Sequence, residues 1–211
     1  MRPGRQSPPI RLRARRWLRR FWPDAADRAR REVAERVYRD LVKQARTPLF
    51  YRDLGVPDTP EGRFEMVGLH AALVVRRLRS AGAPGSALAQ ELFDLLFADV
   101  DEGLRHIGVG DLSVGKHVRR LAGYFYARLH ALDEALDAVP GAPLAPMLRT
   151  NVYHNAAAPS RRQLAGLASY LIAAEAALRA HPSARMLAGD VAWPPPEGAW
   201  ERALCENSKD S

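Results

Sequence analysis

The chain has a single cysteine, Cys205, among its 211 residues. One cysteine excludes a disulfide within the chain and a zinc site built from several cysteines. Every apolar run is far shorter than the roughly 18 residues that a helix needs to cross a bilayer. No stretch alternates polar residues with β-branched apolar ones, so strands are not expected. The single cysteine fits a protein of a reducing compartment.

The sequence also lacks the motifs of the common enzyme classes. It has six histidines but no H-x-x-x-H pair and no H-E-x-x-H, so it does not predict a helical metal site. It contains no G-x-S-x-G elbow and no Ser/His/Asp arrangement. Residues 110–116 match G-x-x-x-x-G-K, but His117 follows the lysine and a helix is predicted before the match, which favours a corner between two helices. We therefore predict no catalytic, cofactor or metal site.

Positive charge is concentrated at one end of the chain. Eight arginines precede the first acid, Asp24, and they account for the formal net charge of +8. The remaining 24 of the 32 Lys and Arg residues balance 24 Asp and Glu residues, so the body is predicted to be neutral. The charge distribution therefore predicts a basic arm rather than a polyanion-binding surface spread over the whole fold.

Residues 10–22 of this arm have helical periodicity, with apolar residues on one face and arginines mainly on the other. Such a helix suits an anionic membrane surface, which we rank first. RNA, with the tryptophans stacking on bases, ranks second, and an organelle transit peptide ranks third. The residues predicted to bind the membrane or RNA are Arg13, Arg15, Arg16, Trp17, Arg19, Arg20, Phe21 and Trp22.

The rest of the chain is predicted to be α-helical, because apolar residues recur at helical spacing and Pro and Gly residues separate the segments. The helices are expected at about residues 24–46, 60–81, 86–106, 111–139 and 160–180, with a loop over 47–60 and a short helix ending at Tyr153. The predicted fold class is all-α: a single compact helical domain of six to eight helices with a basic amphipathic N-terminal arm. The predicted division is an arm at 1–23, the helical domain at 24–196 and a polar C-terminal tail at 197–211.

Local signals predict where these helices begin. Pro60 suits the first position of a helix. Ser86 is expected to cap the next helix after a turn at residues 82–85, and Asp111 or Ser113 is expected to cap the long helix that follows a glycine turn.

Charged and aromatic residues recur at helical spacing on both sides of the glycine turn at residues 108–110. Asp101 and Arg105 are spaced for an i,i+4 ion pair, and exposed aromatic residues are favoured at interfaces. The predicted partner-binding residues are Asp94, Asp101, Arg105, Asp111, Lys116, Arg120, Tyr126 and Arg128. Helix caps and ion pairs within the protein are the competing explanation for each of them.

Several short motifs between residues 38 and 196 follow one another in an order that resembles the ubiquinol–cytochrome c chaperone family. They are Gly55-Val-Pro-Asp-Thr-Pro60, Arg63-Phe-Glu65, Leu69-His70, Leu92-Phe-Asp94, Asp99-Val-Asp101, Leu104-Arg105, Gly108-Val-Gly-Asp111, Val114-Gly-Lys116, Phe125-Tyr126, Arg128 and Asn151-Val-Tyr153. Two positions depart from the family pattern, since His106 stands where an acid is common and Ala127 where Gly is common.

The resemblance implies an all-α protein without catalytic residues that assists assembly of the respiratory cytochrome bc complex. The implied partner is cytochrome b or another subunit of that complex, bound when newly made at or near the membrane, or near a ribosome in mitochondrial relatives. Whether a small partner subunit takes part is left open, and no cofactor is implied. The implied location is the bacterial cytoplasm at the inner face of the inner membrane, or the matrix side in a mitochondrion. The alternative is an RNA- or ribosome-binding adaptor that acts through the basic arm.

Overall fold

The computed structural model describes residues 25–106, 111–137, 144–154 and 158–207. Its helices are α2 (Ala25–Ala45), α3 (Pro48–Arg52), α4 (Pro60–Arg79), α5 (Gly82–His106), α6 (Asp111–Asp137), α7 (Leu144–Asn151), α8 (Arg161–Ala180), α9 (Ser183–Leu187) and α10 (Pro196–Asn207). No strand occurs in these ranges, which confirms the all-α class. Of the nine helices there, only α3 and α9 are as short as five residues. The predicted arm at residues 1–23, with its membrane- or RNA-binding residues, lies outside the described ranges.

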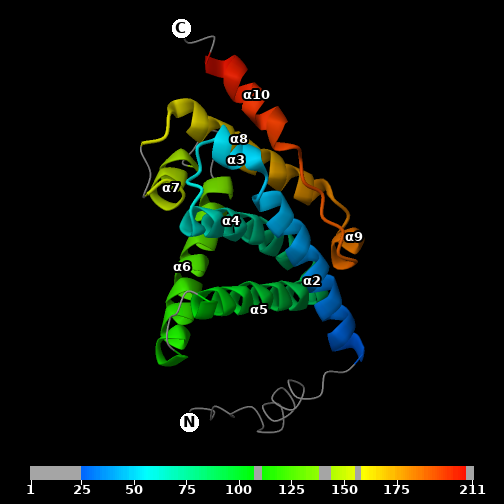
Figure 1. Ribbon diagram of the computed structural model, residues 1–211. Coiled ribbons are helices and arrows are strands. Elements are labelled where there is room, and N and C mark those ends of the chain that lie inside the picture. The colour runs from blue at the N-terminus through cyan, green and yellow to red at the C-terminus, as the bar shows by residue number, and fades with distance from the viewer. Residues whose placement is uncertain (1–24, 107–110, 138–143, 155–157, 208–211) are drawn as a thin grey trace, which may run out of the picture.

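Helix α4 lies at the centre of the fold. It contacts α2, α5, α6, α8 and α9. Figure 1 shows α2 and α6 crossing the opposite ends of α4 and α5. A helix covered from several sides must be apolar on most of its surface. Twelve of the twenty residues of α4 are buried, which fits this central position.

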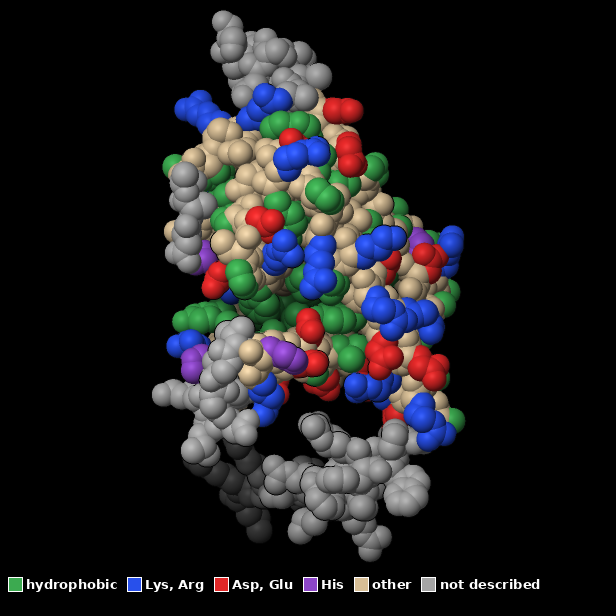
Figure 2. Space-filling view, in the orientation of Figure 1, with side chains coloured by type: hydrophobic (Ala, Val, Ile, Leu, Met, Phe, Trp, Pro, Cys, Tyr) green, Lys and Arg blue, Asp and Glu red, His purple; other side chains and the backbone are tan. Residues whose placement is uncertain are grey.

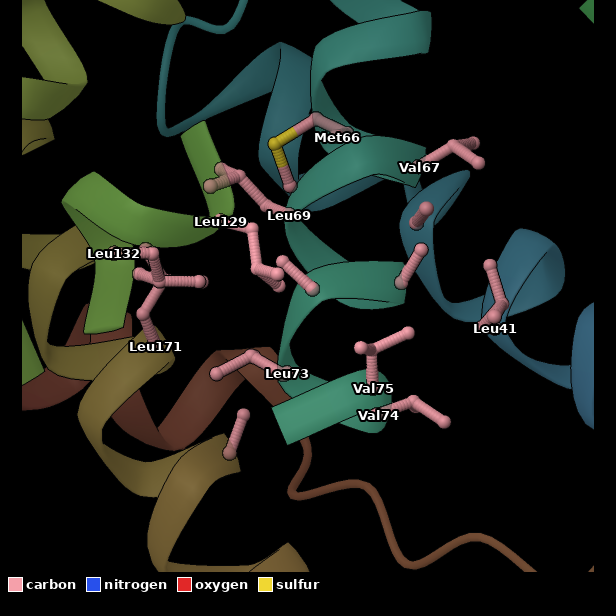
Figure 3. Packing of buried hydrophobic residues seen from close by; sticks show 14 of the residues in the cluster. Leu41, Met66, Val67, Leu69, Leu73, Val74, Val75, Leu129, Leu132 and Leu171 are labelled. Atoms are coloured by element: carbon pink, nitrogen blue, oxygen red, sulfur yellow. The ribbon is translucent and has the colours of Figure 1, made fainter. Parts of the chain in front are cut away.

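The core forms where α4 meets its neighbours. Leu69 and Leu73 of α4 lie towards Leu132 of α6, while Val74 lies towards Leu41 of α2 (Figure 3). Each of the five side chains is at most 3% exposed. Full burial of one such side chain stabilises a fold by about 1.5–3 kcal/mol. This packing fixes α6, and with it the charged and aromatic residues that α6 carries.

The predicted helix starts at residues 60 and 160 are confirmed. Thr59 precedes α4 and its side chain accepts a hydrogen bond from the amide of Gly62 at 3.2 Å, with Pro60 in the first position. Ser160 precedes α8 and forms a capping box with Gln163. Each cap satisfies amides that have no partner inside the helix.

The prediction that Ser86 caps its helix is wrong, because α5 begins at Gly82 and already includes Ser86. Gly82 has a φ of 74°, in the left-handed region that glycine adopts readily. Pro84 lies in the first turn, where its missing amide hydrogen costs nothing. A Cβ on Gly85 would lie 2.0 Å from the carbonyl oxygen of Leu78, so the two helices approach too closely for any larger residue there.

Three helices lie where the sequence predicts none. Helix α3 lies within the predicted loop at 47–60, and Phe50 in it is fully buried. Helix α9 buries Met186, and α10 packs against α8 over residues that the sequence marks as a polar tail. In α10 the structure describes the burial of residues 196–201, and of these Pro196 and Ala199 are buried. Helices that bury one or two side chains show no apolar periodicity, so sequence patterns miss them.

Candidate functional site

The predicted partner-binding residues lie on α5 and α6, two helices that are joined through residues 107–110 and contact each other (Figure 1). Helix α5 carries Asp94, Asp101 and Arg105, and α6 carries Asp111, Lys116, Arg120, Tyr126 and Arg128. The side chains of Asp111 and Lys116 are outside the described part of the protein. The fold therefore places all eight positions on two helices that are consecutive in the chain and cross each other, called the α5–α6 corner below (Figure 1).

An aromatic cluster joins α5 to α6. The rings of Phe93 and Phe97 have centroids 4.5 Å apart, and Phe93 stacks with Tyr126 at 5.1 Å. Phe125 meets Phe93 edge-on at 5.8 Å. These are favourable geometries for aromatic pairs. Phe97 and Phe125 are buried whereas Tyr126 is 47% exposed, so the cluster extends from the core to the surface.

Two tyrosines of α6 are the aromatic residues of the described ranges with large exposed fractions. Tyr124 is 52% exposed and Tyr126 is 47% exposed, and the other large exposed apolar residue of the described ranges is Ile172 of α8. Tyrosine is enriched among the residues that dominate binding energy at interfaces. Tyr126 is in the predicted set, whereas Tyr124 was missed although the Gly-Tyr-Phe-Tyr run contains both.

A small cleft opens beside these aromatic residues. It has a volume of about 130 Å³ and lies between α4, α5 and α6. Its apolar lining comes from Val75, Ala89, Phe93, Phe125, Tyr126 and Leu129. Figure 2 shows apolar side chains gathered where α5 meets the rest of the body. A cavity of about 150 Å³ accommodates a benzene ring, so the cleft suits one apolar side chain of a partner.

Arg128 pairs with a buried carboxylate. Its Nη2 lies 2.6 Å from Oε1 of Glu65 on α4, and Glu65 is 5% exposed. Burial raises the pKa of Glu65 to about 7, against the opposing positive charges of Arg128 and His154. The guanidinium carbon of Arg128 also lies 5.9 Å from the ring centroid of Tyr124. Arg128 thus links α6 to α4, and its place in partner binding stays a prediction.

The other predicted charges that the structure describes are at least partly open to solvent. Nε of Arg105 donates to Asp101 at 2.8 Å, which confirms the i,i+4 pair. Asp94 accepts a hydrogen bond from Nε2 of Gln90 at 3.0 Å. Arg120 is exposed. Solvent-exposed pairs add less than about 1 kcal/mol to stability, so these residues are accessible to a partner at little energetic cost.

A buried polar chain joins α2, α4 and α8. Nδ1 of His70 donates to the carbonyl of Met66 at 2.7 Å, and its Nε2 accepts from the hydroxyl of Tyr170 at 2.8 Å. That hydroxyl in turn accepts from Nε2 of Gln44 at 3.0 Å. Burial lowers the pKa of His70 to about 4, so the ring is neutral at pH 7. His70 has no exposed surface, which makes this chain part of the core.

A second cleft, of about 400 Å³, lies between α4, α6 and α8 and contains several arginines. Arg76 pairs with Asp133 at 2.8 Å, with Asp137, and with Glu175 at 3.8 Å. Three carboxylates surround this guanidinium, so Arg76 is not available to an anion. The ion pairs of Arg76 join α4 to α6 and α8.

The described ranges do not support a phosphate-binding loop, a metal site or a membrane-spanning helix. Gly115 and Lys116 lie inside α6, so the G-x-x-x-x-G-K match does not form a phosphate-binding loop. No group of three or more His, Cys, Asp and Glu side chains there is placed to hold a metal ion. None of the helices described there combines the length and the apolar character that a bilayer crossing requires.

The fold is similar to that of a solved bacterial protein. The crystal structure of the Cbp3 homologue from Brucella abortus superposes with a TM-score of 0.74 at 34% sequence identity. The superposition covers 87% of this chain and 98% of that one. Similarity of this extent reaches well beyond a shared fold class.

Relatives and a family match agree with this likeness. Ubiquinol-cytochrome-c reductase complex assembly factor 1 of Xenopus laevis is 23% identical over 104 residues, which is 49% of this chain and 52% of that protein. Its namesake from Mus musculus is 24% identical over 139 residues, 66% of this chain and 46% of that protein. The chain thus spans about half the length of these two relatives. The pattern described as ubiquinol-cytochrome C chaperone matches residues 52–193, more than half of the chain. The chain therefore belongs to the ubiquinol-cytochrome C chaperone family.

Proposed function

We propose that this protein is an assembly chaperone for the respiratory cytochrome bc complex and that it binds newly made cytochrome b at or near the membrane. The observation that carries the proposal is the family match over residues 52–193, the range that contains the α5–α6 corner. The relatives from frog and mouse are named as assembly factors of the ubiquinol-cytochrome-c reductase complex, and we extend that role to this chain.

The surface of the α5–α6 corner supports binding of an apolar client. Tyr124 and Tyr126 are exposed, Tyr126 lines a small cleft together with other apolar side chains, and charged residues such as Asp94 and Arg120 lie on the same two helices. Tyrosine offers an apolar ring and a polar hydroxyl, which suits contact with a helix that must later be released. We take this corner as the client-binding surface.

The basic arm has a separate proposed role. Its arginines would hold the chaperone at the anionic inner face of the membrane, where each basic residue adds about 1 kcal/mol of attraction. The alternative, an RNA- or ribosome-binding adaptor, predicts that binding is lost steeply with salt and with deletion of the arm. A client-binding chaperone without its arm should still bind its client.

The proposal is tested in a strain that lacks the gene. Cytochrome b haem in its membranes is measured by reduced-minus-oxidised difference spectra, with the full-length protein or a form lacking residues 2–23 restored in parallel. We expect selective loss of the b-type signal, full rescue by the full-length protein and weak rescue by the truncated form. Normal cytochrome b haem in the deletion strain would refute the chaperone role and favour the RNA adaptor.

The same strain tests the client-binding surface. The double substitution Tyr124→Ala and Tyr126→Ala should reduce cytochrome b haem several-fold at an unchanged level of the chaperone, because it removes both exposed rings. Ile172→Ala is the matched control, since Ile172 is an equally exposed apolar residue on α8. Equal rescue by the tyrosine variant and the Ile172 control would show that the client binds elsewhere.

A further inference from the structure

The ion pair between Glu65 and Arg128 is unusual for its burial. The side chain of Glu65 is 6% exposed and that of Arg128 is 23% exposed. Nε of Arg128 is also buried and has no hydrogen-bond partner. A carboxylate so far from water gains little net stability from its partner, because the loss of hydration offsets the attraction.

The protonation behaviour of Glu65 supports this argument. Its pKa is raised from 4.5 to about 7, so the folded protein holds a proton on Glu65 more tightly than the unfolded chain does. The stability contributed by this group is therefore present below about pH 4.5 and is lost as the pH rises to about 7. At higher pH the charged pair exists at a cost to the fold, so the packed position of α6 against α4 is favoured when Glu65 holds its proton. A pair that costs stability at higher pH calls for another role.

The position of the pair indicates that role. Arg128 lies one helical turn after Tyr124 on α6, and its guanidinium lies over the Tyr124 ring. The same guanidinium is bonded to α4 through Glu65. The ion pair thus links Tyr124 to the central helix α4. The other titratable group that acts on Glu65 is His154, which follows α7.

We propose that Glu65 and Arg128 are positioning residues: their buried pair holds Tyr124, and the helix that carries Tyr126, in the orientation that receives a client, and loss of the proton of Glu65 loosens α6 from α4. The part that concerns the client rests on the proposed function. The movement of α6 can be measured without any client, so the two parts fail separately.

The position of α6 against α4 is measured by spin labelling. Cys205, the sole cysteine, is replaced by serine, and labels are attached through Gly68→Cys on α4 and Gly123→Cys on α6. A Cβ at either glycine meets no other atom within 4 Å, so both substitutions fit the structure. Dipolar EPR at pH 8 and pH 6 brackets the pKa of Glu65 at about 7. We expect a narrow distance distribution at pH 6 and a broader one at pH 8.

Matched variants assign any pH response to this carboxylate. Glu65→Gln, which carries no charge at either pH, should give the narrow distribution at both pH values. Glu61→Gln removes an exposed carboxylate one turn away on the same helix, and His154→Gln removes the other titratable group, so both should keep the wild-type response. Arg128→Lys, which keeps the charge but loses the planar fork, should broaden the distribution at pH 6 and serves if Glu65→Gln folds poorly. An unchanged wild-type distribution across this pH range would overturn the proposal.

The link to the client is tested in the deletion strain. Arg128→Lys should lower cytochrome b haem several-fold at an equal level of the chaperone, whereas Glu65→Gln and Glu61→Gln should rescue fully. Full rescue by Arg128→Lys would overturn the positioning role for the client and leave the proposed function standing. Normal haem in the deletion strain itself would instead refute the proposed function.

Discussion

Two aromatic clusters in this protein have similar geometry and different surroundings. In one, Phe50, His70 and Tyr170 have no exposed surface, with Phe50 and Tyr170 4.7 Å apart and Trp193 packed on His70 at 5.0 Å. In the other, on α5 and α6, Tyr126 closes the cluster and is 47% exposed. The difference teaches that ring contacts alone do not assign a role. What covers the rings decides whether they stabilise the fold or face a partner.

The two clusters also differ in how their polar atoms are satisfied. In the closed cluster, the hydroxyl of Tyr170 bonds to His70 and Gln44. In the open cluster, no hydrogen bond is recorded for the hydroxyl of Tyr126 within the described part of the protein. A buried hydroxyl requires partners, whereas an exposed one can bond to water or to another molecule. The closed cluster is therefore expected to determine stability and the open one binding.

The largest expected effect is the loss of a ring from the closed cluster. Phe50→Ala should lower the free energy of unfolding by about 3–5 kcal/mol, because it leaves a cavity in a fully buried position. Tyr126→Ala should change it by less than about 1 kcal/mol, because the ring is half exposed. Urea denaturation of both variants measures the difference. Equal losses of unfolding free energy in the two variants would contradict the distinction between the clusters.

A smaller effect concerns the pH dependence of the closed cluster. The pKa of His70 is lowered from 6.5 to about 4, so the unfolded chain binds a proton between these values and the folded protein does not. The stability from His70 is therefore present above about pH 6.5 and is lost as the pH falls towards 4, by at most about 3 kcal/mol. Urea denaturation from pH 7 to pH 4 should show a steeper loss in the wild type than in His70→Gln. Parallel profiles would mean that His70 is not held neutral.

Much of the fold follows from local signals. The starts of α4 and α8 depend on the cap at Thr59 and the capping box at Ser160, which a few neighbouring residues encode. The start of α5 was predicted wrongly, because the close approach of Gly85 to Leu78 depends on how two helices meet. Patterns that act within one turn can be predicted from sequence, whereas contacts between helices cannot.

The same limit applies to the candidate site. The pair between Asp101 and Arg105 was predicted because its members are four residues apart on one helix. The pair between Glu65 and Arg128 was not, although both residues belong to the motifs that indicated the family, because a contact between α4 and α6 has no sequence period. Tyr124 was left out because its exposure depends on which face of α6 packs inward.

The smallest expected effect on stability comes from the pair on α5. Arg105→Gln should change the free energy of unfolding by less than about 0.5 kcal/mol, since the side chains of Asp101 and Arg105 are 37% and 49% exposed. If both residues face a partner, the same variant should nevertheless reduce cytochrome b haem in the deletion strain.

An exchange of the two charges separates these roles. The double variant Asp101→Arg with Arg105→Asp keeps an i,i+4 pair of opposite charges within the helix but reverses the charge pattern presented at the surface. If the pair serves only the helix, the exchange should rescue cytochrome b haem as well as the wild type does. We expect it not to rescue, because complementary charges on a partner would then face like charges, which costs binding more than it costs folding. Full rescue would remove Asp101 and Arg105 from the binding surface and leave the aromatic cluster of α5 and α6 as its main element.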